Sequence, residues 1–221
     1  MGGIRVLSLT GGTIKNHSVE EAATLLKRDD ALVWVDVPEC SDEAVSLLTE
    51  VLRCHRLAVR DCMQRNRVPR VRIYPHQQLL ILHGPERGRS RHVHYLELDQ
   101  IIGEKYVATV HGPINPTVHL DVALRERDGI RKRIKARRLR PDSPYELSYA
   151  ITSALTHRLE SFIEDLTSGS RQPFRARRPH GGTDLTDGLF PRHDEPHAAE
   201  GRPSHRRSGD RSGALRQRLL S

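Results

Sequence analysis

The sequence predicts an α/β domain over roughly its first two thirds, and three observations support this prediction. Strand-like and helix-like segments alternate up to about residue 62. Four short strand candidates then follow one another between residues 71 and 111, separated by glycine-containing turns. A further helix begins near residue 144, and its apolar period lasts to about residue 167. A chain of 221 residues is long enough for one such domain with a core.

The first strand and the first helix are predicted from the residues before position 27. Ile4–Leu9 is a short strand candidate that ends at the breakers Gly11 and Gly12. Ser18 and Glu21 have the spacing of a capping box, in which the hydroxyl accepts from a backbone N–H group and the Glu side chain reaches back. This pair predicts the start of a short helix. The apolar residues of that helix are Ala22, Leu25 and Leu26.

The next strand and helices are more clearly marked. Ala31–Val37 is rich in β-branched residues without polar alternation before Asp36, so both faces of this strand should be covered. Ser41 is a typical helix cap, and a helix after it gathers apolar side chains on one face. Leu57–Cys62 predicts one or two more helical turns. The apolar face after Ser41 consists of Ala44, Leu47, Leu48, Val51 and Leu52.

The middle of the chain changes to the period of a β-sheet. Turns at Gly84–Gly88 and Gly103-Glu104 separate short apolar runs, which favours antiparallel hairpins. The four strand candidates are Val71–Tyr74, Gln78–His83, His92–Leu98 and Lys105–His111.

Two helices are predicted after the strands. His119–Arg137 is a basic helix candidate. Ser143, Pro144 and Glu146 then combine a capping box with a proline at the first helical position, which is a strong helix start. The apolar residues that continue this helix are Leu147, Ile151, Leu155, Leu159, Ile163 and Leu166.

The composition limits the classes of protein to consider. Residues 168–221 hold eleven arginines, no lysine and six acidic residues, and they lack an apolar period before Leu215. Such a segment buries too little apolar surface to offset its ordering entropy, so we expect a disordered basic tail. No run of 18 apolar residues exists anywhere, so we expect no membrane insertion by this chain. Three cysteines suit a reducing, cytoplasmic location.

Three motifs suggest chemistry, and each has a simpler interpretation. Thr10-Gly11-Gly12-Thr13 resembles the nucleophile motif of L-asparaginases, but a Gly-Gly turn after an edge strand explains it better. The histidines at 83, 92, 94 and 111 could share a sheet face, yet no zinc spacing accompanies them. Arg125–Arg140 holds nine basic residues, which suits a phosphate binder or a solvated helix face. We therefore expect no catalytic residues and no metal ligands, and hence not an enzyme.

From residue 31 onward, several short motifs follow one another in a recognisable order. These motifs are Trp34-Val35-Asp36, His55-Arg56-Leu57-Ala58-Val59-Arg60-Asp61, Arg67-Val68-Pro69-Arg70-Val71 with Tyr74, and Ile102-Gly103-Glu104-Lys105-Tyr106-Val107-Ala108-Thr109-Val110-His111. Ser143-Pro144 and Leu147-Ser148-Tyr149-Ala150 then follow. Together these pieces resemble the cytoplasmic N-terminal domain of CorA-type magnesium and divalent cation transporters. The residues that carry the resemblance are Trp34, Asp36, His55, Asp61, Pro69, Tyr74, Gly103, Thr109 and His111.

The resemblance implies a mixed sheet flanked by helices, followed by a helix that leads into a stalk. It also implies a homopentamer, a Mg²⁺ path, and a location in the cell membrane for intact relatives. The resemblance divides the chain into a CorA-like domain at 1–140, the start of the stalk-leading region at 141–167, and the tail at 168–221. On this interpretation the chain is the cytoplasmic part of a magnesium transporter. The alternative is a soluble module that binds nucleic acid or anionic surfaces.

This chain also departs from the pattern of the family. The pore helices and the Gly-Met-Asn signature are absent, since Met1 and Met63 are the only methionines. We therefore expect a chain truncated before the pore, which does not transport by itself. Glu86 is the only acid in the loop Gly84–Arg91, where relatives can bind regulatory Mg²⁺, and its arginines repel such a cation. The lysine-free tail suggests a reading-frame change, and a genuine regulatory tail is the alternative hypothesis.

Overall fold

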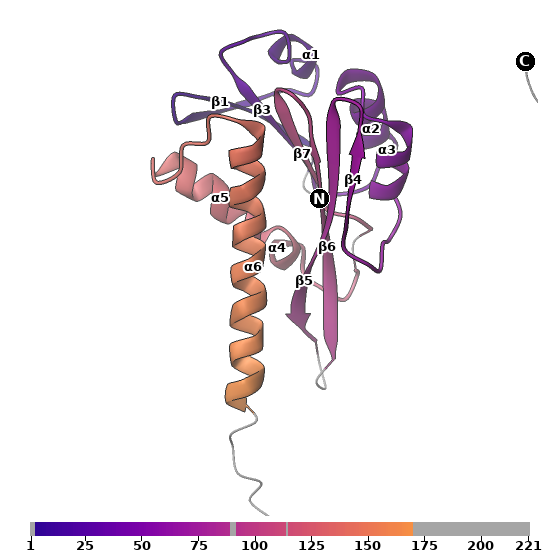
Figure 1. Ribbon diagram of the computed structural model, residues 1–221, viewed down its shortest axis with the longest axis vertical. Helices are drawn as coiled ribbons and strands as arrows, with labels where there is room; N and C mark the ends of the chain where they lie inside the picture. The colour runs from indigo at the N-terminus through magenta and orange to yellow at the C-terminus, as the bar shows by residue number, and fades with distance from the viewer. Residues whose placement is uncertain (1–2, 89–91, 114, 170–221) are drawn as a thin grey trace, which may run out of the picture. The chain divides into compact units, whose positions relative to one another are not determined.

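A seven-stranded mixed sheet forms the centre of the computed structural model, which describes residues 3–88, 92–113 and 115–169 (Figure 1). The strand order is β2-β1-β3-β7-β6-β5-β4. All neighbouring strands are antiparallel except β3 and β7, which are parallel. The predicted α/β class with a mixed sheet is therefore confirmed.

The strands follow the predicted pattern with two differences. The sheet contains β1 (Arg5–Thr10), β2 (Thr13–His17), β3 (Leu32–Val37), β4 (Arg70–Tyr74), β5 (Gln77–Arg87), β6 (Val93–Ile102) and β7 (Tyr106–Val110). Strand β2 was not predicted, and it is the actual edge strand, so β1 lies inside the sheet. Strand β5 also continues through Gly84, where the sequence predicted a turn.

Local chemistry explains both differences. Gly11 and Gly12 have φ angles of 57° and 77°, so they form a two-residue hairpin turn, and the polar segment behind them pairs as an exposed edge. Gly84 instead permits a close approach of a helix to the sheet. A Cβ atom built at Gly84 would lie 2.8 Å from the Cδ1 atom of Leu155.

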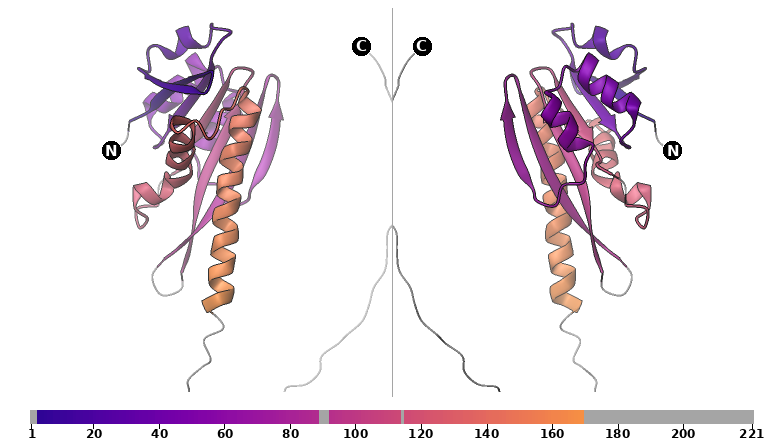
Figure 2. Two further views of the ribbon diagram at one scale, coloured as in Figure 1. Left: turned by 90° about the vertical axis from the view of Figure 1, so that its left-hand side faces the viewer. Right: turned by 90° about the vertical axis from the view of Figure 1, so that its right-hand side faces the viewer.

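Helices are placed on both faces of the sheet (Figure 2). They are α1 (Ala22–Leu25), α2 (Asp42–Ser46), a π-helical turn η1 (Leu47–Val51), α3 (Arg56–Cys62), α4 (Leu120–Ala123), α5 (Arg125–Lys135) and α6 (Pro144–Gly169). One apolar core contains residues of α1, α2, η1 and α3, and the other contains residues of α5 and α6. Strand β3 is buried along its whole length between these layers, as its composition predicts.

Two of the three predicted helix caps form in the structure, and the third does not. Ser41 caps α2 by accepting from the Ala44 N–H group at 3.2 Å, as predicted. Ser143 likewise accepts from the Glu146 N–H group at 3.2 Å. The predicted cap at Ser18 is wrong, because α1 begins only after Glu21. Glu21 does reach back to the Ser18 N–H group at 2.8 Å, so half of that capping box is present.

The helices after the sheet differ from the predicted ones in their bounds. Helix α6 runs to Gly169, two residues beyond the predicted end. The predicted basic helix is broken at Leu124 into α4 and α5. The predicted disordered tail lies outside the described residues apart from residues 168 and 169, so that prediction is not tested.

Asp99 is an unusual member of the core. Its side chain on β6 is fully buried, and no cation pairs with it among the described residues. Burial raises the pKa of the Asp99 carboxyl to about 9, and the negative charge of Glu97 adds to this shift. Asp99 is therefore a neutral acid in the folded chain near neutral pH, whereas an unfolded chain ionises it above about pH 4.

Replacing this carboxyl with an amide should increase stability in a pH-dependent way. Between about pH 4 and the raised pKa, only the unfolded chain releases the Asp99 proton, so the native chain loses stability as the pH rises. We expect Asp99→Asn to remove this loss, so its stability advantage grows by a few kcal/mol from about pH 4.5 to about pH 8. Urea unfolding at both pH values measures the difference, with the exposed Asp165→Asn as the control. An Asp99→Asn effect that is equal at both pH values would contradict this account.

Candidate functional site

A buried carboxylate lies at the junction of strands β3 and β7. Asp36 is fully buried, and its Oδ2 atom accepts from the Arg127 Nη1 group at 2.9 Å. Its Oδ1 atom accepts from the Thr109 hydroxyl at 2.8 Å and lies 3.1 Å from His111 Nε2. Burial alone would raise the pKa of Asp36, but His111 and the Arg127 guanidinium outweigh it and hold the pKa below its ordinary value.

Several residues of the family motifs meet at this carboxylate. Trp34 donates from Nε1 to the Thr109 hydroxyl oxygen at 3.1 Å, and that hydroxyl donates onward to Asp36. The parallel pairing of β3 with β7 sets Asp36 opposite Thr109. Four of the nine predicted residues, Trp34, Asp36, Thr109 and His111, therefore form one hydrogen-bonded network.

The other five predicted residues lie apart from this network. The His55 ring stacks on Tyr74 with 4.4 Å between the centroids, and its Nδ1 atom accepts from the Leu57 N–H group at the start of α3. Asp61 is buried and pairs with Arg72 at 3.1 Å. The remaining two residues are Pro69, beside a cavity of the sheet, and Gly103, in the β6–β7 turn.

Gly103 is needed for close packing in that turn. A Cβ atom built there would lie 2.2 Å from the Tyr106 ring, and the Gly103 N–H group donates to the Tyr106 carbonyl at 2.9 Å.

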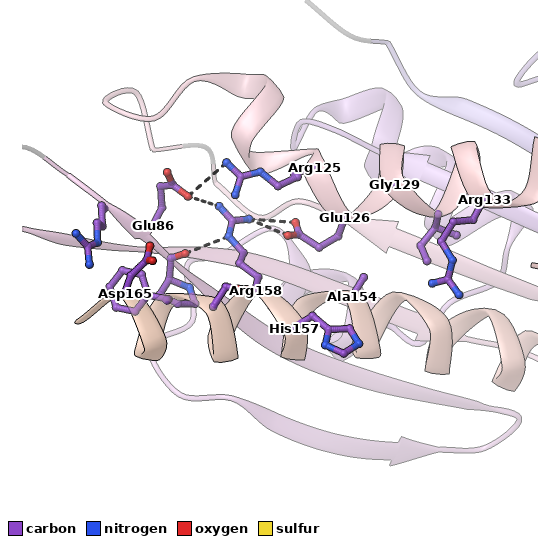
Figure 3. A pocket seen from close by; sticks show the side chains of 14 residues that line it. Glu86, Arg125, Glu126, Gly129, Arg133, Ala154, His157, Arg158 and Asp165 are labelled. Atoms are coloured by element: carbon purple, nitrogen blue, oxygen red, sulfur yellow. Dashed lines mark hydrogen bonds and ion pairs between the residues drawn. The ribbon is translucent and has the colours of Figure 1, made fainter. Parts of the chain in front are cut away.

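A second charge network holds helix α6 against its neighbours, and Figure 3 shows it. The buried Arg158 lies with its Nη2 atom 2.6 Å from Glu86 Oε2 and its Nη1 atom 3.1 Å from both oxygens of Glu126. It also donates to the backbone carbonyls of Pro85 and Val122. One side chain of α6 thereby connects the end of β5, α4 and α5.

The same figure shows a cavity of about 450 Å³ beside this network. Small residues, Gly129 on α5 and Ala154 on α6, leave space between the two helices. Arg133 and His157 flank this part of the cavity. Arg158 and Arg125 face Glu86, and Asp165 lies at the same end of the cavity as Glu86, away from Arg133.

The sequence indicated some of this second network but not its arrangement. Arg125–Arg140 suggested a solvated basic face, whereas Glu126 and Arg127 both point into the protein and are buried. Arg158 carried no sequence signal except that it falls on the inner face of α6, between Leu155 and Phe162. That position, one helical turn from apolar inner residues, is what could have identified it.

Three of the histidines, His83, His94 and His111, line one cavity, but among the described residues they do not form a metal site. His83 lies 2.9 Å from the Asn66 carbonyl and His111 binds Asp36, while the rings of His92 and His94 are 5.7 Å apart. Within the described ranges, no group of three His, Cys, Asp or Glu side chains could hold a metal ion. The Thr10 and Thr13 hydroxyls of the asparaginase-like motif lie at an exposed hairpin turn.

Comparison with known proteins assigns the chain to a family. Residues 29–171 match the model of the CorA-like Mg²⁺ transporter protein family. The chain belongs to this family. The match spans both charge networks and nearly all of the described helices. A comparison with curated protein sequences gave no match.

Solved structures share the same fold. Full-length CmaX is 15% identical, with a TM-score of 0.59, over 75% of this chain and 48% of that protein. The complete CorA magnesium transporter of Methanocaldococcus jannaschii is 14% identical, with a TM-score of 0.57, over 76% of this chain and 49% of that one. The cytoplasmic domain of ZntB from Vibrio parahaemolyticus RIMD 2210633 is 12% identical, with a TM-score of 0.56, over 76% and 64%. This chain thus spans about half the length of the first two proteins.

The described helices contain none that is long and apolar enough to cross a membrane. The similarity to the solved structures is one of fold. It gives no support to the alternative of a nucleic-acid-binding module.

Removing the cation that neutralises Asp36 should destabilise the fold strongly. Arg127→Gln leaves a buried carboxylate without its guanidinium, so we expect a loss of about 3–5 kcal/mol in the free energy of unfolding. Adding Asp36→Asn to this variant should recover part of the loss, because the buried charge disappears. Chemical unfolding measures both effects, and the exposed Arg133→Gln on the same helix is the control. Equal losses for Arg127→Gln and Arg133→Gln would refute the role of the pair.

Removing the Arg158 side chain should release the second half of α6. Arg158→Leu deletes the contacts to Glu86 and Glu126, so we expect backbone amides after residue 158 to exchange hydrogen at least about tenfold faster. His157→Leu is the matched control, because that neighbouring side chain is exposed and pairs only along α6. The prediction is wrong if both variants change exchange equally.

Proposed function

We propose that this chain forms the cytoplasmic domain of a CorA-like divalent cation transporter, with Mg²⁺ as the transported ion. The family match over residues 29–171 carries the proposal, because it runs from the central strand β3 through helix α6. In this proposal the domain at 1–140 is followed at 141–167 by the start of a helix that leads toward the membrane part. The tail at 168–221 follows these two parts.

The charge networks support a mechanical role for this domain. Apolar contacts allow small slips between packed surfaces, whereas the Arg158 guanidinium needs its partners at fixed positions. A displacement of the sheet end or of α5 is therefore passed to α6. We propose that α6 passes such displacements on to the part of the transporter that conducts ions.

The assembly and the role of the chain alone belong to the same proposal. Subunits would meet as a homopentamer, and conduction would come from membrane helices, none of which is among the described helices. Each such helix needs about 20 mostly apolar residues. We propose no enzymatic activity, because the family is one of transporters.

A chimera tests the proposal directly. Residues 1–169 would replace the matching region of the Methanocaldococcus jannaschii CorA transporter, in cells that lack their own Mg²⁺ uptake. We expect the chimera to cross-link up to five subunits and to restore uptake. Arg158→Leu in the chimera should change the rate of Mg²⁺ uptake, because α6 is no longer fixed to the sheet.

Two controls accompany the chimera. The 221 residues alone should give no uptake above cells with an empty vector. His157→Leu in the chimera should behave as the unsubstituted chimera does. A chimera that assembles in the membrane but gives no uptake would contradict the proposed function.

A further inference from the structure

A second cavity opens beside the first half of β6, and its lining includes His111 of the Asp36 network and Pro85, whose carbonyl binds Arg158. Its volume is about 690 Å³, within the range of small-molecule sites. It lies where segment 65–69, β6 and the segment after β7 come together. Ala123 of α4 and Leu159 of α6 also line it.

The sheet is open here because β7 stops pairing with β6. The last paired residues are Val110 and Asp99. Beyond them the chain stays beside β6 through side-chain contacts, such as the 3.2 Å contact between Asn115 Nδ2 and His94 Nδ1. Pro113 has no N–H group to continue the ladder. The cavity is therefore a consequence of the way β7 ends.

The charge of this cavity is positive on balance, because two arginines and one acidic residue line it. Glu97 is its only acid, and Asn66 occupies both of its oxygens, at 2.8 Å through the backbone and at 2.6 Å through the side-chain amide. Arg65 donates to the Pro113 carbonyl, and Arg67 has no acidic partner in the part of the chain that is described. Two guanidinium groups at one cavity favour an anionic ligand.

Two histidines of the cavity lack half of their hydrogen bonds. The only partner of His83 Nε2 is the Asn66 carbonyl, so this nitrogen carries a proton. The contact of His111 Nε2 with the Asp36 carboxylate has the same consequence. The Nδ1 atoms of both rings are buried and have no partner within the described residues. Unsatisfied buried polar atoms in a lined cavity indicate a missing ligand or water.

Much of the remaining lining is apolar, although His94 and Asn115 add polar groups to it. Leu96 is buried at the base of the cavity, and Leu159 lies at the side of α6. A ligand with only charged groups would leave these surfaces in contact with water. The other apolar or aromatic lining residues are Pro69, Pro85, Val93, Tyr95, Pro113 and Ala123.

We propose that this cavity binds a small organic acid. Its carboxylate faces Arg65 and Arg67, its apolar body contacts Leu96 and Leu159, and a polar group reaches His83 or His111. The proposal is independent of cation transport, since it rests on the cavity alone.

Benzoate is the probe for this site, and the imidazole signals of the full chain in NMR spectra are the readout. We expect benzoate to shift the signals of His83 and His111 in a saturable way, while His157 stays unchanged. Benzamide has the same shape without the charge, so it should bind at least about tenfold more weakly. Inorganic phosphate lacks the apolar body and should also bind more weakly.

Two pairs of variants locate the binding. Leu159→Glu places a carboxylate in the wall and should weaken benzoate binding about tenfold, whereas Ile163→Glu, one turn further along α6 and equally exposed to solvent, should not. Arg65→Gln with Arg67→Gln should weaken binding as well, against Lys132→Gln with Arg138→Gln as the control of equal charge. Both pairs alter exposed residues, so folding is preserved. Absence of saturable shifts, equal binding of benzamide, or equal effects within either pair would overturn the proposal.

Discussion

The fold depends on an ionised carboxylate that is held entirely away from water. Asp36 sits in the middle layer, and leaving it unpaired there would cost several kcal/mol. Its partners come from three elements, β7, the segment directly after β7, and α5. The parallel register of β3 with β7 and the position of α5 on the sheet are both constrained by this one group. Apolar packing alone would not fix them so narrowly, because it is not directional.

The Arg158 network continues this constraint toward the end of the domain. Glu126 and Arg127 are adjacent on α5, so one helix binds Arg158 of α6 and Asp36 of β3 at the same turn. A rotation of α5 that favours one pair strains the other. The two networks therefore act together to place α6 relative to the sheet, although Asp36 and Arg158 make no direct contact.

The sequence predicted those features that depend on local pattern. The full burial of β3 follows from its β-branched composition, and the start of α6 follows from Ser143 and Pro144. The motifs singled out Trp34, Asp36, Thr109 and His111, but their convergence in one network depends on the register of β3 and β7, which the sequence does not show. Strand β2 was missed because an edge strand needs no apolar alternation. The sequence did not predict which side of α5 faces the protein, because nothing in a run of arginines distinguishes the buried Arg127 from its exposed neighbours.

The geometry of Arg158 determines what kind of motion the domain permits. A shift of α6 by one residue moves a side chain by about 1.5 Å along the helix axis and rotates it by about 100°. Either change would separate Arg158 from Glu86, Glu126 and two carbonyl groups at once. Sliding of α6 along the sheet is thus costly, whereas a tilt that carries β5, α4, α5 and α6 together preserves the contacts of Arg158. In the transporter proposed above, such a tilt is the motion that α6 would carry toward the membrane part.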